Sequence, residues 1–291
     1  MSKIIQGTTT QSARINAFLR FVGERENMRK LKEAGKPRPW TSDPVLANGH
    51  FCNVRRADDR VTKWIGEWVN TDLVRMQGMQ EKTTWFAYVV ARWFNRPETL
   101  TALTPALHAG WGSAEALRIL RAMDKRDEQI FNGAYIINGA KGMPKYESVV
   151  KLVLSPVWKD PPMRFDYSIE RTWKTIRGYY GMGSFMAGQI VADWQTFGVI
   201  HGKDVNTWAP LGPGSGRGLV WVYGLTKRPS QDRAVALMQQ MHGAIISEYA
   251  SLGNSMSLHD VQNCFCEFSK YVKGGSKRKY HPHDTKQGTL L

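Results

Sequence analysis

Apolar residues recur every three to four positions along most of the chain, which is the spacing of amphipathic helices. These stripes predict helices over the ranges 12–33, 83–95, 97–108, 113–123, 146–157, 166–178, 231–249 and 258–272. Residues 83–95 are apolar nearly all round, which predicts a central buried helix. Residues 133–138 are predicted to form a short strand or an extended link. The pattern as a whole predicts a mainly α fold.

The most distinctive stretch runs from Tyr179 to Trp194. Gly181 and Gly183 stand one residue apart in a predicted tight turn, and an apolar helical pattern follows. Such a helix-hairpin-helix presents backbone N–H groups and the positive end of a helix dipole to a phosphate. The same pattern also serves only to join two packed helices, so both interpretations stay open. Under the first, the two glycines contact the DNA backbone and Gln189 supports them.

The sequence shows no internal repeat and no interdomain linker. We therefore expect one helical domain over residues 1–273, with the helix-hairpin-helix near 168–197. Residues 274–291 are basic and mostly polar, which predicts a flexible tail. The start has no signal-peptide pattern, and no apolar run approaches the roughly 20 residues that span a bilayer. We expect an intracellular protein with no membrane partner.

Charge adds a candidate partner to this picture. Lysine and arginine number 40 against 25 aspartates and glutamates, which gives a formal net charge of +15. The surplus is spread along the chain and indicates a polyanion, most simply nucleic acid, although a merely soluble basic protein is the alternative. Three cysteines without a C-x-x-C pair argue against a disulfide framework and disfavour a zinc site.

Two further stretches carry candidate chemistry. Acids and arginines alternate before a helix that is predicted to start at Asp58 or Asp59. They form either a phosphate site oriented by carboxylates or a plain capping and salt-bridge cluster. The glycine-rich stretch between Asp204 and Leu219 is predicted to be a loop. It is either a nest of N–H groups for an anion, with Arg217 as counter-charge, or a structural turn.

Four stretches in order resemble one phage family: F-C-N-V-R-R-A-D-D-R, G-M-G-S-F-M-A-G-Q-I-V-A-D-W, G-P-G-S-G-R-G-L and C-E-F-S-K-Y. This is the thymine-hypermodification family of alpha-glutamyl/putrescinyl-thymine pyrophosphorylases, or amino acid:DNA transferases. A related helical domain accompanies the 5-hydroxymethyluracil DNA kinases. The resemblance spans Phe51 to Tyr271. It implies a helix-hairpin-helix, DNA-glycosylase-like fold.

The resemblance also implies a reaction. An amine displaces pyrophosphate from 5-pyrophosphoryloxymethyl-uracil in DNA, and the donor is an amino acid or polyamine such as glycine, glutamate or putrescine. The target base must leave the helical stack or lie in a single strand. The work would take place in the cytoplasm of an infected bacterium. A divalent cation such as Mg²⁺ is left open, and no metal ligand is assigned.

The residues in the matched stretches receive candidate roles. Asp59 is the preferred base for the attacking amine, and Asp193 and Glu267 are the other carboxylates. For Asp193 a role in capping or orienting an arginine is favoured, and Glu267 with Lys270 could form only a helix-surface ion pair. Arg56 is assigned to the departing pyrophosphate. The remaining substrate-binding candidates are Asn53, Arg60, Trp208, Gly212, Gly214, Ser215, Arg217 and Lys270.

Each of these candidates has a specific expected contact. Arg60 and Arg217 supply charge to the pyrophosphate, and the segment 212–215 supplies N–H groups. Trp208 is expected to stack on the base. Asn53 either reads the edge of the uracil or fixes a turn, and both interpretations stay open.

Two rival functions remain. A hairpin DNA glycosylase would use an aspartate such as Asp204, but Phe185 stands near the position of its lysine and the G-P-G-S segment near that of its aspartate. A non-catalytic helical partner of a 5-hydroxymethyluracil DNA kinase would bind DNA and leave the bases unchanged. The sequence contains no G-K-[ST] phosphate loop, so it does not predict the ATP site of a kinase.

Overall fold

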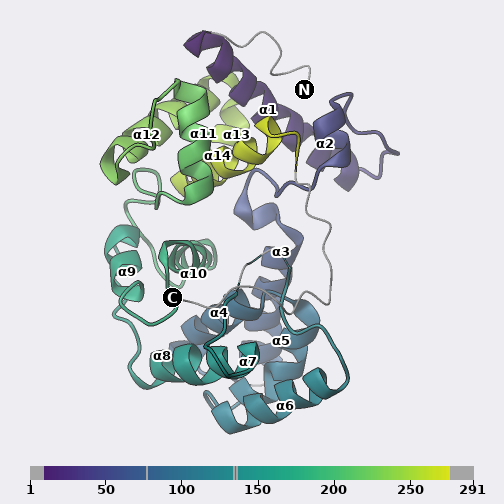
Figure 1. Cartoon of the computed structure of the whole chain (residues 1–291), viewed down its shortest axis with the longest axis vertical. Helices are drawn as coiled ribbons and strands as arrows, with labels where there is room; N and C mark the ends of the chain where they lie inside the picture. Colours follow the sequence, from purple (N-terminus) through teal and green to yellow (C-terminus); the bar gives the residue numbers. More distant parts are fainter. Residues whose placement is uncertain (1–9, 77, 134, 136, 276–291) are drawn as a thin grey trace. The chain divides into compact units, whose positions relative to one another are not determined.

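The computed structural model describes residues 10–76, 78–133, 135 and 137–275. Across these residues the protein is mainly helical and no β-strand is formed (Figure 1). The expected mainly α class is therefore confirmed. The described chain divides into two compact units, with residues 10–59 and 203–275 in unit 1 and residues 60–202 in unit 2. The single domain over residues 1–273 stays a prediction, and nearly all of the predicted tail, residues 276–291, lies outside the described residues.

The helices of unit 1 come from both ends of the chain. They are α1 (Gln11–Glu33), α2 (Pro44–Asn48), the short 3-10 helix η1 (Arg56–Asp58), α11 (Pro213–Tyr223), α12 (Gln231–Glu248), α13 (Ala250–Gly253) and α14 (Leu258–Val272).

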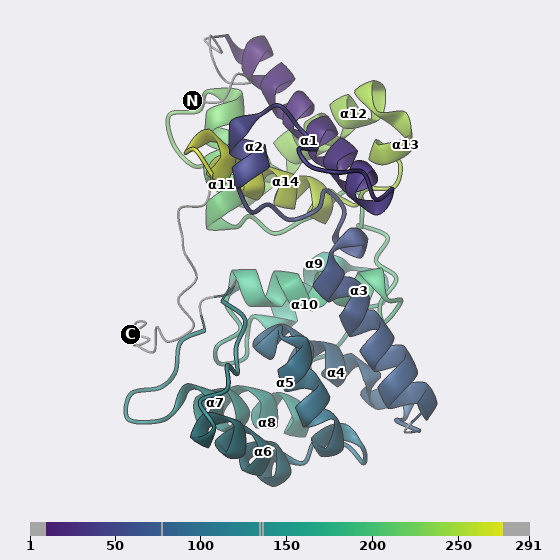
Figure 2. The same ribbon diagram turned by 90° about the vertical axis from the view of Figure 1, so that its right-hand side faces the viewer.

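Unit 2 is formed by the middle of the chain. Its helices are α3 (Arg60–Glu67), η2 (Trp68–Met76), α4 (Glu81–Phe94), α5 (Pro97–Leu103), η3 (Thr104–Leu107), α6 (Ser113–Lys125), α7 (Lys145–Ser148), η4 (Val149–Leu154), α8 (Ser155–Lys159), α9 (Ile169–Ile176) and α10 (Ser184–Thr196). In both views α6, α7 and α8 lie together (Figure 2). No helix in the described ranges is long and apolar enough to cross a bilayer.

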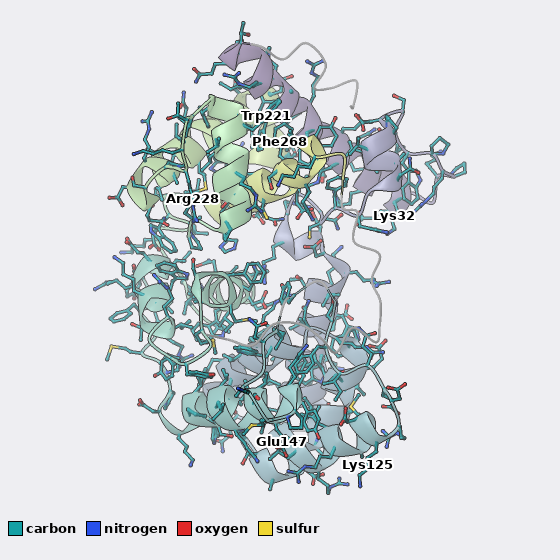
Figure 3. The ribbon with its side chains drawn as sticks, viewed as in Figure 1. Lys32, Lys125, Glu147, Trp221, Arg228 and Phe268 are labelled. Atoms are coloured by element: carbon teal, nitrogen blue, oxygen red, sulfur yellow. The ribbon has the colours of Figure 1, made fainter. Side chains whose placement is uncertain are left out.

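The core of unit 1 is aromatic. Phe18 of α1 stacks on Phe265 of α14 with ring centroids 4.4 Å apart, and Phe268 meets Phe18 edge-on at 5.2 Å. Trp221 of α11 approaches Phe268 at 5.2 Å, and the two labelled side chains lie next to one another in Figure 3. These contacts fix α1 and α11 on α14, because the apolar stripe of each helix is buried against the others.

The glycine-rich stretch after Asp204 is not the expected loop. Its second half is helical from Pro213 onward, and its glycines lie against α14. A Cβ atom on Gly218 would lie 2.1 Å from the carbonyl oxygen of Phe265, and one on Gly214 would lie 2.3 Å from the Sγ atom of Cys266. The glycines are therefore required for the close approach of two helices, which outweighs their low helix propensity.

Unit 2 is built around α4, which is buried on almost every side as predicted. The indole N–H of Trp194 on α10 donates to the backbone carbonyl of Trp85 on α4 at 3.0 Å, and this bond ties the two helices together. Helix α9 packs against α10 and completes a helix–turn–helix. Gly181 in the turn has a φ of +76°, a conformation that favours glycine. The specific glycosylase-like fold stays a prediction.

Proline changes two of the predicted helices. The stretch 97–108 ends as the 3-10 helix η3, which contains Pro105. The stretch 146–157 is interrupted by the π-helix η4, which ends just before Pro156. Proline has no N–H to donate to an α-helical bond, so the neighbouring turn tightens or widens.

We expect Gly218→Ala to destabilise the protein by about 3 kcal/mol, because the new methyl group would overlap a backbone carbonyl that cannot move without shifting α14. Gly243→Ala is the matched control. Gly243 lies inside α12, and no atom lies within 4 Å of the position that its new methyl group would take, so this change should stabilise by about 0.5–1 kcal/mol. Urea unfolding followed by tryptophan fluorescence measures both, and equal midpoints for the two variants would contradict the packing argument.

Candidate functional site

The segment 51–59 of unit 1 is held along its backbone by two helices. The N–H of Cys52 donates to Glu267 of α14 at 3.1 Å, and the N–H of Arg56 donates to Asp260 of α14 at 2.7 Å. From α1, the guanidinium of Arg25 donates to the carbonyls of Cys52 and Asn53. Two of the four matched stretches, 51–60 and 266–271, are therefore brought into contact.

Asn53 closes a small loop within this segment. Its backbone N–H donates to Asp59 Oδ1 at 2.9 Å, and its side-chain amide donates to the carbonyl of Asp58 at 2.8 Å. Arg55 and Arg29 bind Asp58 at 2.7 and 3.5 Å. Of the two interpretations for Asn53, the structure shows the one in which it fixes a turn. Its contact with a uracil edge stays a prediction.

Glu267 is not part of a surface ion pair, which corrects one of the expected alternatives. Its side chain is 3% exposed, although it contacts Lys270 at 2.5 Å. Its carboxylate also accepts the N–H of Cys52. A buried carboxylate with a cation and a backbone donor is costly to disturb, so Glu267 holds the segment 51–59 in place.

Several charged side chains lie close enough to the thiol of Cys52 to influence its pKa. Burial among surrounding atoms raises the pKa of the thiol to about 12, even though Cys52 as a residue is exposed. The carboxylates of Glu267 and Asp59 raise it further, and Lys270 and Arg25 oppose them. Four charged groups from three segments thus act on one atom. We call these four residues with Cys52 the Cys52 cluster.

The N-terminus of α11 lies close to the same part of α14. Arg217 lowers the pKa of the Cys266 thiol, against the larger effect of burial, which raises it. Arg228, labelled in Figure 3, donates to the carbonyl of Leu211 at 2.9 Å, just before the helix. Arg228 therefore lies at the N-terminus of α11 and Arg217 belongs to the same helix, and a helix N-terminus is a favourable place for an anion.

Not every predicted donor of this stretch is available. The N–H of Gly212 donates to the hydroxyl of Ser215 at 3.0 Å, which corrects its assignment to an anion. That hydroxyl is fully buried and also accepts from Gln262 at 3.0 Å. The predicted N–H groups of Gly214 and Ser215 lie in the first turn of α11.

Trp208 is buried. It is 7% exposed. Stacking on a base stays a prediction, and it requires this ring to become exposed first.

Asp193 lies in unit 2 and is completely buried in an ion pair. Both of its carboxylate oxygens accept from the guanidinium of Arg92, which is itself 3% exposed. Arg92 also donates to Asn95 and Thr62, each at 2.9 Å. The network joins α3, α4 and α10. Asp193 therefore orients an arginine, Arg92, which is the role favoured for it from the sequence.

The hairpin residues also belong to unit 2. Gly183 precedes α10 and is exposed, and a Cβ atom there would meet nothing within 4 Å. A Cβ atom on Gly181 would approach Val153 at 3.0 Å, so this glycine has a packing role. The side-chain oxygen of Gln189 accepts a hydrogen bond from the hydroxyl of Tyr135 at 3.0 Å. Arg60 starts α3 of the same unit.

Sequence reasoning missed three of these residues. Arg25, Arg92 and Asp260 are all buried and all hold a matched segment in place. The available signal was a charged residue inside an apolar helical stripe. Arg25 follows Phe18, Phe21 and Val22 at helical spacing, where a solvated arginine is not expected.

Unit 1 also has a pocket of about 560 Å³ between α1 and the corner of α12 and α13. Its charged lining residues are Arg20, Glu24, Glu26, Lys30 and Asp43, and none of the predicted site residues belongs to it. Within the described residues no group of three His, Cys, Asp or Glu side chains is arranged to hold a metal ion.

We expect Asp193→Asn to cost about 3–5 kcal/mol of stability, because it leaves the buried Arg92 without its countercharge. Glu170→Gln is the control, since Glu170 pairs with Lys174 on the surface of the same unit and should contribute less than about 1 kcal/mol. Chemical denaturation reads out both. A cost below the control's would mean that the buried pair does not stabilise the fold.

We expect Cys52 to react slowly with iodoacetamide at neutral pH, because its raised pKa keeps the thiol protonated. The rate should rise with pH toward about 12. Glu267→Gln removes the nearest negative charge, so it should lower the pKa and speed the labelling at a fixed pH. Peptide mass spectrometry separates Cys52 from the other two cysteines. An unchanged rate in the variant would contradict the proximity of Glu267.

Comparisons with known proteins agree on one family. Residues 12–280 match the family model described as "5-hmdU DNA kinase, helical domain". A "5-hmdU DNA kinase" of Bacillus phage SP10 is 25% identical over 286 residues, which cover 87% of this chain and 44% of that protein. The chain thus spans less than half the length of this relative, and no solved structure matches it. The chain belongs to the family of the helical domain of 5-hmdU DNA kinases.

Proposed function

We propose that the chain is a transferase of phage DNA modification, which replaces pyrophosphate on 5-pyrophosphoryloxymethyl-uracil in DNA with an amine. The observation that carries the proposal is the Cys52 cluster. There the carboxylates of Asp59 and Glu267, from two distant segments, act on one thiol together with Lys270 and Arg25. The family of the chain supports a role in thymine modification.

The proposed reaction is a displacement at the 5-methylene carbon. The amine nitrogen forms a bond to this carbon, the bond from the carbon to the pyrophosphate oxygen breaks, and pyrophosphate leaves with the electron pair. The attacking ammonium must first lose a proton, which Asp59 is proposed to accept. Glu267 is buried and bonded to the segment 51–59, so its proposed role is to position Asp59 and Lys270.

The departing pyrophosphate carries several negative charges. Lys270 and Arg217 are proposed to stabilise it, together with Arg56 and the N–H groups at the start of α11. Lys270 and Arg217 both influence the pKa of Cys266, which supports their common neighbourhood. The donor is proposed to be an amino acid or a polyamine, and glycine, glutamate and putrescine all present the required amine.

DNA is proposed to reach the chain through the hairpin of unit 2. Gly183 stands at the start of α10, which has thirteen residues and no side chain capping its N-terminus. Such an end attracts a phosphate. The target base is proposed to leave the helical stack before it reacts, in the cytoplasm of the infected bacterium.

The second candidate is a non-catalytic DNA-binding partner of a 5-hydroxymethyluracil DNA kinase. It is favoured by the match itself, which concerns the helical domain of such kinases and covers 44% of the phage relative. A glycosylase has less support. Phe185 stands near the position where such an enzyme carries its lysine.

Incubation of DNA that carries 5-pyrophosphoryloxymethyl-uracil with a pool of amines tests the proposal. We expect a new nucleoside that contains one amine, with pyrophosphate released, after digestion and mass spectrometry. Asp59→Asn should lower turnover by about 100-fold or more, because it removes the general base that accepts the proton of the amine. DNA affinity should change little, because no phosphate-binding cation is lost. Glu115→Gln, a carboxylate in a surface ion pair of α6, is the control that should keep full turnover.

The three functions give different outcomes in this assay. Unchanged DNA with every donor would reject the transferase and favour the binding partner. A free base with an abasic site would favour the glycosylase. Full turnover by Asp59→Asn, with product formed, would leave the transferase standing and reject Asp59 as its base.

A further inference from the structure

Unit 2 carries four large apolar side chains that are about half exposed or more. Met163, Tyr167, Tyr180 and Phe185 are 49–67% exposed, and they are the large hydrophobic residues of the described ranges that face water to this extent. All four lie within the short stretch 163–185 around α9 and the hairpin turn. Large apolar side chains exposed along one stretch of the chain indicate an interaction site. We call these four residues the hairpin surface.

The backbone around these residues is tied together. The hydroxyl of Tyr179 in the turn donates to the carbonyl of Asp160 at 2.8 Å, which joins the turn to the segment that carries Met163 and Tyr167. The indole N–H of Trp173 on α9 donates to the backbone carbonyl of Ser184, at the start of α10, at 3.1 Å. The hairpin surface therefore rests on one connected framework.

The ring of Phe185 is held in position although half of it is exposed. Tyr135 meets it edge-on with centroids 5.1 Å apart, and the hydroxyl of Tyr135 is anchored to Gln189 on the same helix as Phe185. A ring that is fixed before binding loses little conformational freedom when a partner stacks on it. Phe185 is also the second residue of α10, next to the exposed N-terminal end at Gly183.

The same stretch of the chain also carries cations. The stretch 159–185 contains five lysines and arginines against three aspartates and glutamates. The exposed guanidinium of Arg171 lies 5.0 Å from the ring centre of Phe165, and that of Arg177 lies 4.6 Å from that of Trp173. Aromatic rings interleaved with cations are typical of surfaces that bind single-stranded nucleic acid.

The charge decides between the occupants of this surface. The chain has a formal net charge of +15, so two copies would repel one another. A polyanion with flat aromatic groups satisfies both the cations and the rings. We propose that the hairpin surface binds an unpaired stretch of DNA, with Phe185 and Tyr180 stacking on bases and Arg171 and Arg177 beside the phosphates.

This inference rests on the proposed function only for its DNA partner. It adds a reason why a base stays out of the helical stack, since rings beside the phosphate contact would hold the opened strand. It also assigns a function to the exposed ring of Phe185.

Binding of the full chain to a fluorescein-labelled strand of thymidines, followed by anisotropy, tests the proposal. The second probe is the same strand with its central bases removed, so that its phosphates remain. We expect Phe185→Ala and Tyr180→Ala each to raise the Kd for the intact strand about tenfold, because each loses a stacked base. The same variants should bind the abasic strand as the unchanged protein does.

Three further variants separate stacking from other effects. Phe185→Trp keeps an aromatic face and should restore binding, whereas Phe185→Leu keeps an apolar side chain without a ring and should not. Arg171→Gln should weaken both probes equally and reduce the dependence of Kd on salt. Arg118→Gln, on the exposed side of α6, is the charge control and should leave the Kd within about twofold of the unchanged protein.

Several outcomes would overturn the proposal. These are an unchanged Kd in both alanine variants, an equal loss for intact and abasic strands, or restored binding by Phe185→Leu. Analytical ultracentrifugation provides one more. If the unchanged protein is a dimer and the alanine variants are monomers, a second copy covers this surface instead. The assay contains no amine and no pyrophosphate, so failure of the transferase chemistry and failure of this surface are read separately.

Discussion

The contact between α11 and α14 is the constraint on which unit 1 depends. Gly214 and Gly218 let the backbone of one helix touch the other, with no room for a methyl group at either position. Helix α14 in turn carries Glu267 and Asp260, which hold the segment 51–59 through its N–H groups. The geometry of the Cys52 cluster thus follows from how closely two helices pack, because a helix moved outward by a side chain would withdraw both acceptors.

In unit 2 a buried ion pair, and not close helix packing, fixes the position of the candidate site residues. The buried pair of Arg92 and Asp193 joins three helices, among them the hairpin helix α10. Burying two charges costs desolvation, and here each nitrogen of the guanidinium donates to at least one acceptor, which offsets that cost. Its effect is to fix α10, and with α10 the exposed end at Gly183 and the ring of Phe185. A rigid interior therefore supports an exposed and charged surface.

Patterned residues were predicted best. The apolar stripes located most of the helices, among them the buried helix α4, and the order of four short motifs indicated the family group to which the chain is related. Residues whose role depends on a distant partner were predicted least well. Arg25 and Arg92 carry no local motif. The spacing of Glu267 from Lys270 is compatible with a catalytic carboxylate and with a surface ion pair, whereas the structure shows Glu267 buried and bonded to the segment 51–59.

The sequence by itself determined the helical class, the positions of most helices, the surplus of positive charge and the hairpin. All of these follow from local periodicity and composition, which need no knowledge of long-range contacts. Only the tertiary structure decided that the glycine-rich stretch is a helix, that Asp193 is an internal ion-pair partner, and that Asp59 and Glu267 share one neighbourhood. The reason is physical, because each of these depends on burial against a segment far away in the chain, and the same residues in water would behave differently.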